Sequence, residues 1–204
     1  MLRAVDKSQL LRNLRVWMGA ESGSQRILDA MTKGTRVEQV HEARENLRRH
    51  GVRACFFLQF GYPGEGWKEL QETIAFVRET RPDDVGISFS YPLPGTAFYD
   101  RVRAQLGPKR NWTDSDDLCI MFKGAYSSDF YRLVRNALHA EVDSWRDSDS
   151  SIETRNEIDG LWRSVLEAEP MSRNPEAIEF RETSTNLTSS TLISIEQLAP
   201  LARA

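Results

Sequence analysis

The stretch RVWMGAESGSQRILDAMTKG (residues 15–34) decides how the rest of the chain is interpreted. It begins as a short apolar strand, turns on small residues and continues as an amphipathic helix. Glu21 stands where the strand should end, between Gly19 and Gly23. A carboxylate at the end of a buried strand has to be paired, solvated or used by a ligand.

The composition predicts a soluble globular protein of one domain, or of one domain with an appendage. The chain has 204 residues, of which 40% are hydrophobic and 28% charged. Its net charge of −3 favours no polyanionic partner, so nucleic acid is not expected. No apolar run has the length of a membrane span or of a signal peptide, and a cytoplasmic location without membrane attachment is expected.

Strand and helix periodicities alternate along the first half of the chain, as in βα units. Strands are expected at 14–18, 52–60 and 85–93. Two helices, ending near 33 and 51, follow the first strand, and one helix follows each of the others, ending near 82 and 107. The strands begin roughly 35 residues apart, which suits right-handed parallel crossovers. The fold class is therefore α/β with three parallel strands, either as an open layer or as a piece of a larger (β/α) barrel.

The second half of the chain has a different pattern. Two amphipathic helices are expected, from SDFYRLVRNALHAEVDSW (128–145) and RNEIDGLWRSVLEAE (155–169). Everything after Pro170 is rich in Ser, Thr, Asn and Glu and is expected to be poorly ordered. The predicted organisation is thus a βα region over 1–123, a helical extension over 124–170 and a mostly disordered tail over 171–204.

Polar residues follow all three expected strands, where ligands bind in parallel α/β folds. The candidate binding residues share this position at a strand end, and they are Glu21, Ser22, Gln59, Gly61, Ser88, Ser90 and Tyr91. A carboxylate can accept both hydroxyls of a ribose, and glycine at a strand edge lets a flat base approach the backbone. The pattern therefore favours a nucleoside site that Glu21 helps to hold.

A purely structural interpretation stays open for each of these groups. Ser22, Ser24 and Gln25 can form a helix cap, and Glu21 can be a favourable charge at a helix N-terminus. Gln59 can be a satisfied core amide. The sequence GYPGEG (residues 61–66) lacks the Lys-Ser/Thr ending of a phosphate-binding loop.

Three motifs in register resemble the later strands of radical S-adenosylmethionine (SAM) enzymes. They are MGAESGSQRILDAMTKG, FFLQFGYPGE and ISFSYPLPGTAFYD, followed by KRNWTDSDDL. The likeness is to the group with an N-terminal cobalamin-binding domain, relatives of the anaerobic Mg-protoporphyrin monomethyl ester cyclase, and it covers about residues 16–142.

The resemblance implies a six-stranded partial barrel in which the strands ending at Glu21, Gln59 and Tyr91 are the fourth, fifth and sixth. It implies that Glu21 and Ser22 contact SAM, that the segment with Gln59 and Gly61 packs near adenine, and that residues 88–91 lie beside it. Intact members of the group carry a [4Fe–4S] cluster on a C-x-x-x-C-x-x-C loop, act on small-molecule substrates, and often use cobalamin for methyl transfer.

The chain departs from that group in its cysteines. Cys55 and Cys119 are the only two, so the three ligands of the cluster are absent. No metal site and no catalytic residue are expected here. A missing N-terminal half or a separate cluster-bearing chain is the expected partner. The alternative is a non-catalytic, vestigial module that pairs with another protein through its exposed strand edges.

Overall fold

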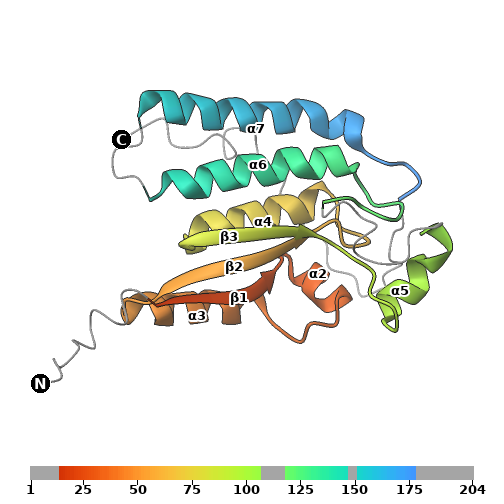
Figure 1. Cartoon of the computed structure of the whole chain (residues 1–204), viewed down its shortest axis with the longest axis horizontal. Coiled ribbons are helices and arrows are strands. Elements are labelled where there is room, and N and C mark those ends of the chain that lie inside the picture. Colours follow the sequence, from red (N-terminus) through yellow and green to blue (C-terminus); the bar gives the residue numbers. More distant parts are fainter. Residues whose placement is uncertain (1–13, 107–117, 147–150, 178–204) are drawn as a thin grey trace, which may run out of the picture.

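The computed structural model describes residues 14–106, 118–146 and 151–177 of the chain. Within them, three strands form one parallel sheet in the order β1-β2-β3 (Figure 1). The strands are β1 (Arg15–Glu21), β2 (Arg53–Phe60) and β3 (Asp84–Phe89). The helices are α2 (Gln25–Ala30), α3 (Val37–Arg49), α4 (Trp67–Thr80), α5 (Ala97–Val102), α6 (Ser128–Ser144) and α7 (Ile152–Ser172), with a 3₁₀ turn, η1 (Arg103–Gln105), after α5.

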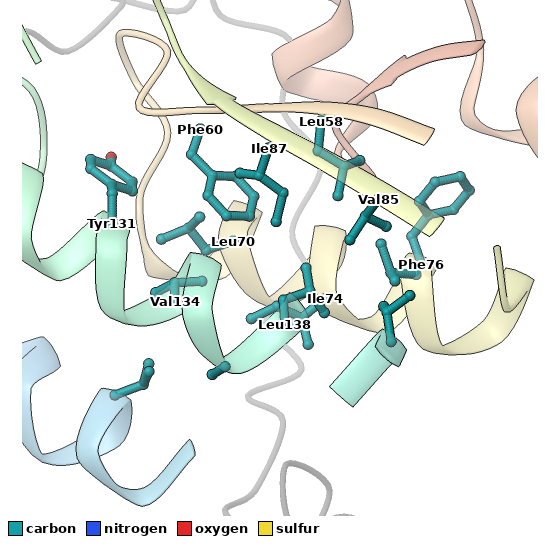
Figure 2. Packing of buried hydrophobic residues seen from close by; sticks show 14 of the residues in the cluster. Leu58, Phe60, Leu70, Ile74, Phe76, Val85, Ile87, Tyr131, Val134 and Leu138 are labelled. Atoms are coloured by element: carbon teal, nitrogen blue, oxygen red, sulfur yellow. The ribbon is translucent and has the colours of Figure 1, made fainter. Parts of the chain in front are cut away.

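One face of the sheet carries the main hydrophobic core. Alternate strand residues point to this face, and they include Leu58, Phe60, Val85 and Ile87. Figure 2 shows them meeting side chains of α4 and α6, and α7 lies outside α6 (Figure 1). The core therefore joins the βα region to the two C-terminal helices.

The opposite face of the sheet, here called the open face, consists of the remaining strand residues. Its members are Arg15, Trp17, Gly19, Arg53, Cys55, Phe57, Gln59, Asp84, Gly86 and Ser88. None of them belongs to the main core, and Trp17 and Phe57 are 39% and 50% exposed. The sheet is thus packed on one side only in the described part of the chain.

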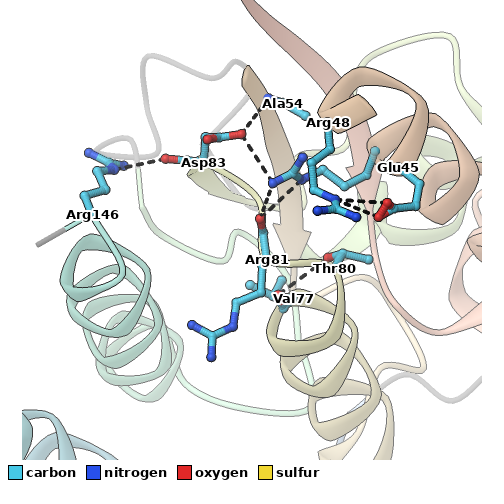
Figure 3. A network of polar contacts seen from close by, with 9 residues as sticks. Glu45, Arg48, Ala54, Val77, Thr80, Arg81, Asp83 and Arg146 are labelled. Carbon is cyan, nitrogen blue, oxygen red and sulfur yellow. Dashed lines mark hydrogen bonds and ion pairs between the residues drawn. The ribbon is translucent and has the colours of Figure 1, made fainter. Parts of the chain in front are cut away.

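A network of polar contacts lies at the amino end of the sheet (Figure 3). Arg44 of α3 donates from Nε and Nη2 to the Arg81 carbonyl at 3.2 and 2.7 Å. Asp83 accepts from the Ala54 amide at 2.8 Å, and its own carbonyl accepts from Arg146 Nε at 2.9 Å. These bonds fix α3 and the segments that follow α4 and α6 to one end of the sheet.

A second polar group holds the C-terminal helices. Glu141 of α6 accepts two hydrogen bonds of 2.8 Å from Arg78 of α4 and one of 2.7 Å from Trp162 Nε1 of α7. The Arg78 guanidinium also lies over the Trp162 ring, 4.9 Å from its centre. One buried carboxylate thus joins α4, α6 and α7.

The sequence predicted the α/β class, the three strands and their parallel order, and these predictions are confirmed. β1 extends to Glu21, three residues beyond the predicted end, and β3 stops at Phe89, before Pro92. α7 starts earlier than predicted and continues through Pro170 to Ser172. The predicted tail from 178 onward lies outside the described residues, and the three-part division of the chain remains a prediction.

Candidate ligand site at the strand ends

Glu21 has an unusual backbone at the end of β1. Its φ is +60°, a left-handed conformation that strains a residue with a side chain. The register of β1 against β2 shifts between Gly19 and Glu21, so the chain bulges there. A carboxylate oxygen of Glu21 lies 2.7 Å from the point where a Cβ on Gly19 would stand. The missing side chain of Gly19 therefore lets this carboxylate lie over the open face.

Lys33 is the partner of Glu21. Its Nζ donates to Glu21 Oε1 at 2.6 Å, and the two side chains are 41% and 18% exposed. The turn after α2 brings Lys33 back to the strand end through positive φ values at Thr32 and Gly34. The sequence alone did not indicate Lys33, because this return depends on local backbone geometry and not on a spacing rule.

Gln59 and Ser88 continue the site on the neighbouring strands. They are direct partners in the β2–β3 register and lie on the open face. Below them, the rings of Trp17 and Phe57 stack with centres 4.6 Å apart, close to the Cα of Gly86. Glu21, Gln59 and Ser88 therefore form a polar rim above an aromatic floor, all at the carboxyl ends of parallel strands.

Ser22 and Gly61, two other candidates, face the packed side of the sheet. Ser22 is 1% exposed, and its hydroxyl lies 3.0 Å from that of Thr73 on α4 and accepts from the Ser24 amide at 3.1 Å. A Cβ on Gly61 would stand 2.5 Å from Ile120 Cδ1. Both residues have packing roles here, and a contact with SAM stays a prediction for each.

The cap proposed for α2 takes a different form from the predicted one. The N-cap is Ser24, and its side chain makes no capping hydrogen bond. Ser22 binds Thr73 instead, and Gln25 bonds to Asp29 and to the Val37 amide. The small residues after β1 thus serve mainly the contact between this turn and α4.

Ser90 and Tyr91 follow β3. Ser90 is 2% exposed, its amide donates to the Phe60 carbonyl at 2.7 Å, and its hydroxyl has no hydrogen-bond partner. Tyr91 is half-buried and packs against a second, smaller core that contains Val102 and Phe122. The amide bond to Phe60 places Ser90 beside the end of β2.

Unpartnered buried groups gather at this end of the sheet. Glu65 Oε1 and the hydroxyl groups of Ser90 and Tyr131 are buried without a hydrogen-bond partner of good geometry. Glu65 accepts from the Gly61 amide at 2.5 Å, and the Tyr131 ring lies 3.2 Å from the Cβ position of Gly61. Buried polar groups are nearly always satisfied, so such a cluster marks a functional or strained region.

A cavity of about 410 Å³ lies elsewhere, between the start of α6 and the end of α7. Its charged lining residues are already paired, Lys123 with Glu176 and Arg173 with Glu169. One lining residue, Ile120, packs against Gly61 just after β2, but the cavity offers no unpaired charged group among the described residues. We therefore place the candidate site at the polar rim.

The described residues do not fit an iron–sulfur cluster. Among them, no group of three His, Cys, Asp or Glu side chains is close enough to hold a metal ion. Cys55 is fully buried in β2, and burial raises the pKa of its thiol. Cys119 lies in the loop before α6, where its sulfur is 3.6 Å from the Ser128 hydroxyl. A [4Fe–4S] cluster needs several thiolates converging on one point, and this part of the chain does not provide them.

No helix in the described residues combines the length and the apolar character that a membrane crossing requires.

Comparison with known proteins finds several relatives of low identity, although no family model matches the chain. An uncharacterized methyltransferase of Pyrococcus horikoshii is 29% identical over 125 residues, which are 60% of this chain and 27% of that protein. A putative methylthiotransferase of Methanocaldococcus jannaschii is 34% identical over 87 residues, 43% of this chain and 19% of that protein.

A third relative has a named substrate. The bacteriochlorophyllide d C-12(1)-methyltransferase of Chlorobaculum tepidum is 28% identical over 107 residues, 52% of this chain and 23% of that protein. The chain thus spans about a quarter of the length of the curated relatives it matches. These three relatives are named for the transfer of methyl or methylthio groups.

Proposed function

We propose that this chain forms one wall of a SAM-binding pocket in a protein of the methyl-transfer class, as the C-terminal part of a radical SAM (β/α) barrel. The polar rim of Glu21, Gln59 and Ser88 is the ligand-binding part of that wall. The observation that carries the proposal is the position of Glu21: its backbone is left-handed, and its carboxylate lies over the open face beside Lys33.

The chemistry of the rim suits a nucleoside with an amino-acid tail. The Glu21 carboxylate can accept ribose hydroxyls, and the Lys33 ammonium can donate to a carboxylate. Gln59 and Ser88 supply a neutral amide and a hydroxyl on the next two strands. The relatives named as methyltransferases support SAM as the nucleoside, since SAM is the common donor of methyl groups.

The one-sided packing of the sheet supports a role within a larger barrel. In a closed (β/α) barrel, helices cover the outside and alternate strand residues fill the inside in layers. In this proposal the open face takes the inward position, with the exposed, stacked rings of Trp17 and Phe57 as one bulky layer and the rim above it. Any cluster chemistry requires thiolates from outside the described residues.

Ligand-observed NMR tests the site directly. With the 204-residue chain and millimolar SAM, saturation transfer to the adenine and ribose protons is expected, while calorimetry gives little heat because half of the pocket is missing. The Glu21→Gln variant should lose most of the transfer, because the ribose hydroxyls lose their charged acceptor.

The matched control is Glu38→Gln, which removes an exposed carboxylate that pairs with Arg36 on α3. It should leave the signal unchanged. Absence of transfer in the unmodified chain, or equal loss in both variants, contradicts the proposal.

A second function is supported by the free strand edges. β1 and β3 each have one edge without a strand partner in the described sheet. Such edges and an exposed apolar face suit a non-catalytic module that pairs with another protein. SAM binding that depends on Glu21 separates the first proposal from this one, because edge pairing does not require that carboxylate.

A further inference from the structure

The turn that follows β2 is held from inside by a buried acid. This GYPGE turn (residues 61–65) uses positive φ values of 77° at Gly61 and 87° at Gly64. It brings Glu65 back under the strand end, where one carboxyl oxygen accepts from the Gly61 amide at 2.5 Å and the other has no hydrogen-bond partner of good geometry. Arg26 of α2 also donates to the Gly64 carbonyl.

Glu65 is fully buried, and burial raises its pKa from 4.5 to about 8. The groups that face it are Glu69 on α4, Tyr131 on α6 and Arg26 on α2. The hydrogen bond from the Gly61 amide lowers the pKa of Glu65, as do Tyr131 and Arg26, and Glu69 raises it. Burial raises this pKa by more than these groups lower it. The carboxyl group is consequently neutral at pH 7 in the closed turn.

Tyr131 of α6 interacts with the Glu65 carboxyl group. Its hydroxyl is buried, and its ring packs on Phe89 and on the Cβ position of Gly61. The pKa of Tyr131 is raised well above 10 by burial and by the nearby Glu65. The strand end, the turn and the start of α6 thus meet at one pair of buried, neutral acids.

We propose that Glu65 is a positioning residue: its protonated carboxyl group fixes the GYPGE turn and hence the end of β2 that carries Gln59, and its ionisation lets the turn open. The opening is expected to lower the affinity for a ligand in mildly alkaline solution, and this consequence rests on the proposed nucleoside site. The opening itself is a property of the chain without ligand.

The physical reason is the cost of a buried charge. An ionised carboxylate in an apolar interior is unfavourable, and it regains hydration when the turn swings outward. The opening equilibrium therefore increases by up to tenfold per pH unit between the normal and the raised pKa, and it levels off above the latter.

Hydrogen exchange of the Gly61 amide measures this opening in the 204-residue chain. After correction for intrinsic exchange, protection at Gly61 should fall by about tenfold or more between pH 6 and pH 8 and then level off. It should also be lower than the protection at Phe56 in the middle of β2. In Glu65→Gln the fall should disappear, because a neutral amide replaces the acid.

Two further variants separate positioning from general stability. Tyr131→Phe removes a group that lowers the pKa of Glu65, so the levelling-off should move to higher pH. Glu79→Gln removes a carboxylate of α4 that is 72% exposed, and it should behave as the unmodified chain does. A fall in protection that persists in Glu65→Gln, or Gly61 protection equal to that of Phe56 at every pH, overturns the inference.

Adding SAM distinguishes the two proposals. If pH-dependent opening is present but SAM never protects Gly61, the positioning role stands and the nucleoside site fails. If SAM protects Gly61 while protection without ligand does not vary with pH, the nucleoside site stands and the role of Glu65 fails.

Discussion

Glu21 is a residue that stability alone does not explain. A left-handed backbone at a residue with a side chain costs about 1–2 kcal/mol, and glycine would remove that cost. The ion pair with Lys33 is partly exposed and returns only a fraction of it. Strain that the surrounding structure maintains is typical of functional sites.

Replacing Glu21 by glycine should therefore separate stability from binding. We expect Glu21→Gly to unfold at the same denaturant concentration as the unmodified chain, or with a free energy up to about 1 kcal/mol higher, since relief of strain offsets the lost pair. Saturation transfer to SAM should disappear. Thr32→Gly is the matched control, because Thr32 has a φ of 56° but no carboxylate.

If Thr32→Gly also abolishes the transfer, the loss reflects the turn rather than the acid.

The pKa of Glu65 predicts how stability varies with pH. The native state retains the proton up to about pH 8 and the unfolded chain only to about 4.5, so the native state binds more protons between these values. Stability is therefore highest below pH 4.5 with respect to this group and decreases as the pH rises to 8, by about 1.4 kcal/mol per pH unit at most.

Urea unfolding at pH 5, 6, 7 and 8 measures this dependence. The unfolding free energy of the unmodified chain should decrease steadily relative to that of Glu65→Gln as the pH rises. A difference that is constant across the series contradicts a raised pKa.

At this scale the sequence indicated part of the candidate site, whose ligand stays a prediction. Glu21, Gln59 and Ser88 could be identified because parallel strands place their carboxyl ends together, a rule that needs only strand assignments. Lys33 could not, since it reaches Glu21 through two left-handed residues after α2. The buried state of Ser22 and Glu65 depends on α4 and α6, and local spacing carries no information about it.

Close contact between elements explains the glycine at position 23. α4 packs directly on the turn after β1, and a Cβ on Gly23 would stand 2.6 Å from both the Glu72 carbonyl oxygen and Phe76 Cβ. The Ser22–Thr73 contact lies at the same place. The turn that carries Glu21 is therefore positioned by a helix that follows β2.

Two glycine-to-alanine changes should have opposite effects on stability. Gly23→Ala forces α4 away from the turn, and we expect a loss of about 1–3 kcal/mol in the free energy of unfolding. Gly160→Ala lies in the middle of α7 with open space around the new methyl group, and we expect a gain of about 0.5–1 kcal/mol. Thermal and urea unfolding of both variants provide the measurement.

Equal effects of the two changes would show that the contact between α4 and the turn is looser than described.

Element boundaries were predicted less well than element types. Apolar periodicity located the three described strands and the long helices, but α7 continues through Pro170 to Ser172, where a proline was expected to end it. The 3₁₀ turn after α5 was predicted as part of one helix. These differences arise from tertiary packing and cap geometry, which a single sequence does not specify.

In the part of the chain that the structure describes, one face of the sheet is apolar and exposed, as the inside of an incomplete barrel would be. Trp17 and Phe57 lie in the middle of this open face, between two strand edges that have no partner among the described strands. Surfaces of this kind associate in solution. The parallel order of the strands was predictable from the spacing of βα units, whereas the partial barrel stays part of our proposal.

Light scattering over a range of chain concentrations measures this association. We expect the unmodified chain to form oligomers as its concentration rises, and the double variant Trp17→Gln/Phe57→Gln to remain monomeric to higher concentration. Met171→Gln is the control, because Met171 is 87% exposed on α7, away from the sheet. A monomeric unmodified chain with cooperative unfolding contradicts both the barrel-fragment and the edge-pairing proposals.

Strand order and chain order coincide in this sheet, and β1 is an edge strand. A chain with this topology can be cut between two successive βα units. The cut breaks one peptide bond and separates one pair of hydrogen-bonded strands, and neither piece passes through the other. Two separately translated pieces could then recombine by simple lateral addition. Such an arrangement makes trans-complementation between gene products mechanically straightforward.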